Sequence, residues 1–175
     1  MFAVGRPRAA RGYGEGMEWR VRMAAVWAEA DRLEGAEFVR RVDELAAERP
    51  DDPLALFEQG GSRDSTGDEA GAERFYRAAL AAGLPADERA QCVIQLASTV
   101  RNLGRPEESL ELLREEFEGR PDSPYADAGV AFAALALVDL GRPVEAVAAL
   151  LHALTPHLPR YHRSVPAYAD ALLER

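Results

Sequence analysis

Apolar residues recur at helical spacing along most of the chain, and glycine or proline interrupts them at short intervals. Val26, Trp27 and Ala30, for example, fall on one face of the first predicted helix. The predicted helices cover about residues 17–33, 36–48, 54–65, 68–82, 87–103, 106–118, 126–140, 143–155 and 164–174. No segment shows the alternation of apolar and polar residues that is typical of a half-buried strand.

Three turns centred on glycine repeat 37 residues apart, at Gly67, Gly104 and Gly141. Each turn follows one predicted helix and precedes another. At fixed distances after each glycine come a small residue, then an aromatic residue or leucine, then a large apolar residue (Ala72, Ser109 and Ala146; Tyr76, Leu113 and Leu150; Leu80, Phe117 and Leu154). A helix–turn–helix period of this length is typical of stacked helical hairpins, and such arrays usually present a binding surface.

The predicted fold class is therefore all-α, a right-handed superhelix of about three helical hairpins with flanking helices. We expect a disordered leader over residues 1–16, an N-terminal helical pair over 17–52, repeats over 53–160 (53–86, 87–123 and 124–160) and a C-terminal capping helix over 161–175.

Several residues mark where the predicted helices begin. Asp52 is a candidate helix cap, and Pro53 suits the first helical position because its missing N–H has no partner there. Pro106 and Pro143 fall just after a turn glycine, where the same argument applies.

The hairpins resemble the tetratricopeptide repeat family over about residues 36–172. The residues that carry the resemblance are Leu56, Gly60, Ala72, Tyr76, Ala79 and Pro85 in the first hairpin, Leu96, Ala97, Ser109, Leu113 and Pro121 in the second, and Ala134, Leu137, Ala146, Leu150 and Ala153 in the third. Segments such as Asp64-Ser65-Thr66-Gly67 are similar to the small bacterial branch called tetratricopeptide repeat group 5. Arg63 in place of a tyrosine departs from the family pattern.

The resemblance implies that the first helix of each hairpin lines a concave groove. The candidate groove residues are Phe57, Asp64, Gln91, Gln95, Ser98, Arg101, Asn102 and Asp139. One hypothesis is that Gln95, Ser98, Arg101 and Asn102 bind a peptide backbone or a carboxylate, because arginine's planar fork suits a carboxylate and amides bond a peptide on both sides. The alternative is that Arg101 pairs with Asp64 or Asp139 across the groove and fixes hairpin stacking.

The resemblance does not extend to the family members that clamp chaperone C-termini with lysine and asparagine. The matching positions here are Phe57, Gly61, Gln95, Ala128 and Phe132. The residues of that clamp are therefore absent from the sequence.

The charge of the chain narrows the class of partner. Its formal net charge is −9, and every basic residue is arginine. This balance argues against nonspecific binding to nucleic acid and against docking on anionic membranes. Residues 1–22 are the exception, with five Arg and two Glu. The basic segment is an electrostatic tether, a disordered leader, or the product of translation begun upstream of a natural start near Met17 or Met23.

The sequence gives little support for a metal site, a cofactor or a reactive cysteine. His152, His157 and His162 are spaced five apart, which does not place three metal ligands on one helix face. We therefore expect no metal site and no cofactor. Cys92, the single cysteine, is interpreted as a buried thiol in a reducing cytoplasm, and no segment has the pattern of a signal peptide.

The sequence thus favours a noncatalytic, cytoplasmic adaptor that binds a protein or peptide in its groove, and no nucleophile motif or lysine supports an enzyme. Two alternatives stay open. One is a regulatory sensor that responds to a peptide, and the other is a self-associating module in which Trp19 and Trp27 of the N-terminal helix contact a second copy.

Overall fold

The computed structural model describes residues 8–174, with side chains from residue 16 onward. Its helices are α1 (Arg8–Trp27), α2 (Gly35–Ala46), α3 (Pro53–Ser65), α4 (Glu69–Ala82), α5 (Ala86–Asn102), α6 (Pro106–Phe117), α7 (Ala126–Asp139), α8 (Pro143–Leu154) and α9 (Ser164–Leu173), with the short 3-10 helices η1 (Ala30–Arg32) and η2 (Thr155–His157). The described part of the chain contains no strand. The predicted all-α class is confirmed.

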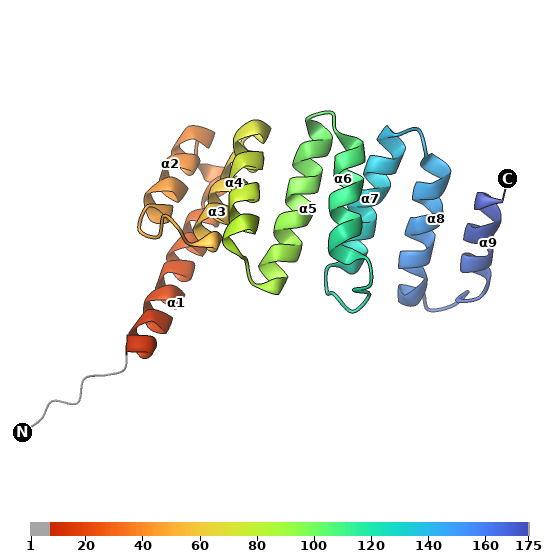
Figure 1. Ribbon diagram of the computed structural model, residues 1–175, viewed down its shortest axis with the longest axis horizontal. Coiled ribbons are helices and arrows are strands. Elements are labelled where there is room, and N and C mark those ends of the chain that lie inside the picture. The colour runs from red at the N-terminus through yellow and green to blue at the C-terminus, as the bar shows by residue number, and fades with distance from the viewer. Residues whose placement is uncertain (1–7, 175) are drawn as a thin grey trace, which may run out of the picture.

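Helices α2 to α9 stand side by side in one elongated row that follows the order of the sequence, and α1 extends obliquely from its N-terminal end (Figure 1). Each packs on the next one along the chain, and α5 also contacts α3 and α7. The first helices of the predicted hairpins, α3, α5 and α7, therefore form one layer. Their hairpin partners α4, α6 and α8 pack against that layer.

The first helix differs from its prediction at both ends. It begins at Arg8, so the backbone of residues 8–16 is helical where the sequence predicted a disordered leader. Residues 1–7 of that leader lie outside the described residues. Alanine and arginine at positions 8–11 favour a helix, and a helix propagates readily from a packed segment. At the other end, η1 follows Trp27 in place of further α-helix, and this turn leads the chain back into α2.

The three turn glycines adopt the conformation that their spacing predicted. Gly67, Gly104 and Gly141 have φ values of 84°, 81° and 72°, in the left-handed region that side chains disfavour. In each turn the residue after the glycine donates its N–H back across the helix end, from Asp68 to Arg63 O (2.9 Å), from Arg105 to Val100 O (3.0 Å) and from Arg142 to Leu137 O (2.8 Å). All three helices thus end in the same Schellman-type cap.

Side chains and prolines set the helix starts as expected. The Leu54 N–H donates to Asp52 Oδ1 at 2.9 Å, with Pro53 at the first helical position of α3. The Gly71 N–H donates to Asp68 Oδ1 at 2.9 Å at the start of α4.

The repeated apolar pattern is buried in the first two hairpins and opens in the third. Tyr76 and Leu113 are buried, whereas the matching Leu150 is 41% exposed. Leu80 and Phe117 likewise pack against core clusters, whereas Leu154 is exposed. The small residues Ala72, Ser109 and Ala146 are buried in all three hairpins.

Replacing Ala72 or Ala146 with leucine should lower the free energy of unfolding by about 1–3 kcal/mol. Both alanines are buried in apolar clusters, so a larger side chain must displace its neighbours. Urea denaturation measures the change, with Ala81→Leu at an exposed position of α4 as the control. Unchanged midpoints for both buried variants would contradict the register of the repeats.

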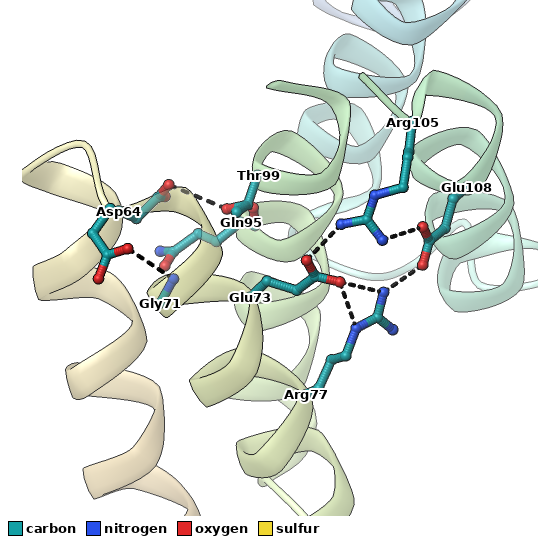
Figure 2. Close-up of polar contacts among 9 residues, drawn as sticks. Asp64, Gly71, Glu73, Arg77, Gln95, Thr99, Arg105 and Glu108 are labelled. Atoms are coloured by element: carbon teal, nitrogen blue, oxygen red, sulfur yellow. Dashed lines mark hydrogen bonds and ion pairs between the residues drawn. The ribbon is translucent and has the colours of Figure 1, made fainter. Parts of the chain in front are cut away.

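Four charged side chains join α4 to α6 on the side of the array formed by the second helices (Figure 2). Arg105 contacts Glu73 at 2.5 Å and Glu108 at 2.8 Å, and Arg77 contacts the same two carboxylates, with a distance of 2.9 Å to Glu73. Each cation thus bridges both anions, which makes a closed network. Hydrogen bonds from Arg105 and Arg77 lower the pKa of Glu73.

The stabilisation from Glu73 should depend on pH. A carboxyl whose pKa is lower in the folded state contributes stability above its unfolded pKa, and that contribution is lost as the pH falls through the folded pKa. We expect Glu73→Gln to cost about 1 kcal/mol near pH 7 and progressively less towards about pH 3. Thermal unfolding at several pH values tests this, and an equal cost throughout would show that the charge of Glu73 contributes nothing.

Candidate functional site

A pocket of about 580 Å³ opens between α3 and α5, the first helices of two successive hairpins. Gln91, Gln95, Ser98 and Asn102 line it from α5. Phe57, Glu58, Gly61, Asp64 and Ser65 line it from α3, with Tyr76 from α4 and Trp27 from the end of α1. The pocket therefore combines three aromatic rings with amides, hydroxyls and two carboxyl groups.

Most of the residues predicted for the groove meet in this pocket. Phe57, Asp64, Gln91, Gln95, Ser98 and Asn102 line it, and Arg101 and Asp139 do not. Trp27, Glu58 and Tyr76 line it although they were absent from the predicted set. From the sequence, Trp27 is a candidate contact for self-association and Tyr76 is a residue of the repeat pattern, while Glu58 has no predicted role.

Arg101 points towards the third hairpin. Its guanidinium forms an ion pair with Asp139 of α7 at 3.1 Å and also donates to Asn102 Oδ1 at 3.1 Å. Of the two partners considered from the sequence, the contact is thus with Asp139, and it joins α5 to α7.

Two glycines in the middle of α3 allow the aromatic residues to approach its backbone. A Cβ at Gly60 would lie 2.5 Å from the Tyr76 ring, and a Cβ at Gly61 would lie 3.1 Å from the Trp27 ring. An edge-to-face contact with Phe38, at a centroid distance of 4.9 Å, helps to orient Trp27. Paired glycines inside a helical pattern are the sequence signal for this close approach.

Hydroxyl groups connect the inner part of the pocket to its carboxyl and amide groups. The Tyr76 hydroxyl lies 2.7 Å from Gln95 Oε1 and 3.3 Å from Asp64 Oδ2. The Thr99 hydroxyl lies 2.9 Å from the Gln95 carbonyl and 3.1 Å from Asp64 Oδ1, and Figure 2 shows how Thr99 and Asp64 face each other between α5 and α3. Each hydroxyl thus has one proton and two acceptors within reach.

The two carboxyl groups of the pocket are both disfavoured as anions. Burial raises the pKa of Asp64, and hydrogen bonds from Thr99 and Tyr76 offset only part of that effect. Burial also raises the pKa of Glu58, although Trp27 Nε1–H donates to its Oε2 at 2.5 Å. Arg20, the cation that acts on Glu58, forms its ion pair with Glu88 at 3.0 Å.

The other candidate chemistries do not gather around this pocket. Cys92 is buried, its thiol donates to the Tyr76 carbonyl at 3.6 Å, and burial raises its pKa to about 12. His152 and His157 contact Asp170 (2.9 Å) and Asp127 (2.7 Å) on the surface, far apart in the sequence from the pocket. Within residues 16–174, no three His, Cys, Asp or Glu side chains are grouped so that they could hold a metal ion.

Comparison with known protein families identifies the family described as "Tetratrico peptide repeat", which matches residues 53–172. The match includes α3 to α8 and all of α9 except its last residue. The match supports the group 5 branch of that family, and its helical-repeat superhelix agrees with the row of packed helices. No curated protein matches the chain.

Proposed function

Because this chain belongs to the tetratricopeptide repeat family, whose repeats generally mediate protein–protein interaction, we propose that it is a noncatalytic adaptor. The pocket between α3 and α5 binds a segment of a protein or peptide partner. The observation that carries the proposal is the pocket itself, because it joins polar groups from two hairpins with three aromatic rings at the layer of first helices.

The size and lining of the pocket suit a peptide. Its volume of about 580 Å³ lies within the range of about 300–1,000 Å³ that is typical of ligand sites. The amides of Gln91, Gln95 and Asn102 each carry donors and an acceptor, which match the N–H and C=O groups of an extended chain. We propose that these amides hold the peptide backbone and that the aromatic end of the pocket takes one side chain.

Selection from a displayed library of linear peptides tests this proposal. Ser98→Trp places a bulky side chain in the pocket, so selected peptides should bind this variant at least about tenfold more weakly than wild type. Glu111→Trp adds the same side chain at an exposed position of α6 and should leave binding unchanged. Selected peptides that bind all three proteins equally would place the binding surface elsewhere.

The cellular setting of the adaptor is also part of the proposal. No helix among the described residues is long and apolar enough to cross a membrane. We propose that the protein acts in a bacterial cytoplasm, as its resemblance to group 5 repeats suggests, and that its partners are proteins rather than nucleic acid or lipid.

Self-association is the second candidate function, at a different surface from the one the sequence suggested. Trp19 is only 2% exposed, and its indole N–H donates to the Leu45 carbonyl at 2.9 Å, so it packs inside its own chain. A large exposed apolar stripe lies instead on α8, at Val144, Val147, Leu150 and Leu154. If this stripe pairs two copies, Val147→Asp should reduce the mass in light scattering to that of a monomer; a wild type that is already monomeric contradicts the candidate.

A further inference from the structure

The charged residues that line the pocket between α3 and α5 are both acidic. They are Glu58 and Asp64 of α3, and among the side chains that the structure describes no arginine lines the pocket. Arg101, the cation expected from the sequence to meet a carboxylate there, is paired with Asp139. A ligand that entered with a carboxylate would therefore meet two carboxyl groups, while Arg20 and Arg101 are already paired with Glu88 and Asp139.

The inner part of the pocket has more hydrogen-bond acceptors than donors. The hydroxyls of Tyr76 and Thr99 offer two protons, and both Asp64 oxygens, Gln95 Oε1 and the Gln95 carbonyl lie within reach of them. The shorter contact of each hydroxyl is to Gln95, at 2.7 Å and 2.9 Å. These two protons therefore serve four acceptors, so the Asp64 carboxylate shares its donors with Gln95, and a ligand with several N–H groups would supply further donors.

Glu58 lies beside the aromatic rings, where it can also accept hydrogen bonds from a ligand. Within residues 16–174, Trp27 is its hydrogen-bond donor, and this bond holds one carboxylate oxygen next to the indole. Phe57 and Tyr76 lie nearby, with their ring centroids 6.0 Å apart. Aromatic faces beside a carboxylate favour a cation, because the ring quadrupole and the negative charge both attract it.

From this arrangement we infer that the pocket recognises a cationic side chain, arginine or lysine, of the bound peptide. The inference rests on the proposed function and names its specificity. The aliphatic stem of the side chain packs against Trp27 and Phe57, and the charged end donates hydrogen bonds to Glu58 and Asp64. The amides of α5 hold the neighbouring backbone.

Titration with four capped pentapeptides tests the inference, each with alanine at the four outer positions. The central residue is arginine, lysine, citrulline or glutamate; citrulline has the shape of arginine without its charge. The two indole N–H signals of the ¹⁵N-labelled protein report binding, since Trp27 lines the pocket and Trp19 is buried elsewhere. The Trp27 signal is identified as the one lost in Trp27→Phe.

The arginine and lysine peptides should shift the Trp27 signal saturably, with dissociation constants on the order of 1 mM or below, and leave the Trp19 signal in place. The citrulline peptide should bind at least about tenfold more weakly, and the glutamate peptide should cause no shift. Equal affinity for arginine and citrulline, or no shift with either cationic peptide, would overturn the inference.

The double variant Glu58→Gln and Asp64→Asn separates charge from folding. It keeps the shapes and an acceptor for Trp27 and Thr99, so its melting temperature near pH 7 should equal or exceed that of wild type. Its preference for arginine over citrulline should disappear, whereas Glu111→Gln on α6 should keep it. If the folded double variant still prefers arginine over citrulline, the inference is overturned. The proposed function still stands in that case if Ser98→Trp weakens the binding of the selected library peptides.

Discussion

Replacing Tyr76 with alanine should lower the free energy of unfolding by about 3–5 kcal/mol, the typical cost of emptying a buried aromatic site. Tyr76 is fully buried and lies in the core cluster that joins α3, α4 and α5, where Ala72, Cys92 and Leu96 surround it. Its ring also fills the space above Gly60. The cavity would therefore open between two hairpins rather than within one, and urea denaturation followed by circular dichroism measures its cost.

Tyr76→Phe separates the ring from the hydroxyl. It keeps the packing and removes the donor shared by Gln95 and Asp64, so the expected loss is about 1 kcal/mol. If the alanine and phenylalanine variants lost the same amount, the hydroxyl would account for the whole effect and the packing argument would fail.

The helices and their turns could be predicted from the sequence because their signals are local. The left-handed glycines at 67, 104 and 141 and the proline starts of α3, α6 and α8 depend on backbone preferences of one or two residues. The prediction of a disordered leader was wrong at residues 8–16, where the structure has helix. The sequence prediction also missed η1 and η2, which are too short to show a helical period.

The candidate site was only partly predictable, for a physical reason. The resemblance to the repeat family placed Gln91, Gln95 and Ser98 in one groove, and all three line the pocket. Neither the resemblance nor the helical spacing shows where α1 packs against the repeats. The hydrogen bond between Trp27 and Glu58 could therefore not be predicted. The partner of Arg101 was likewise open, because a long side chain can reach either neighbouring hairpin.

The ionised forms of the two carboxyl groups in the pocket are unfavourable for folding. Burial raises the pKa values of Glu58 and Asp64, and an acid whose folded pKa is raised contributes stability that is lost as the pH rises through that pKa. Near neutral pH both carboxylates therefore oppose folding, in contrast to Glu73 in the network between α4 and α6. A cation bound in the pocket would offset this cost. The two partly buried carboxylates therefore account both for the unfavourable contribution to folding and for the proposed preference for a cation.

The second large effect is expected at Gly60, where valine should lower the free energy of unfolding by about 3 kcal/mol. Its Cβ would lie 2.5 Å and 2.6 Å from two carbons of the Tyr76 ring, well inside contact distance. The ring cannot move away easily because it is buried on all sides. Thermal and urea unfolding measure the loss, and Ala70→Val at an exposed position of α4 controls for the helix propensity of valine.

A size-compensating pair identifies the cause of that loss. In the Tyr76→Leu background the smaller side chain leaves room, so Gly60→Val should cost less than about 1 kcal/mol, and the double-mutant cycle should give a coupling energy of about 2 kcal/mol. If the cost of valine were the same in both backgrounds, Tyr76 would not be what excludes a side chain at position 60. Because the same close approach places Tyr76 beside Asp64 and Gln95, a coupled pair would also show that Gly60 shapes the pocket.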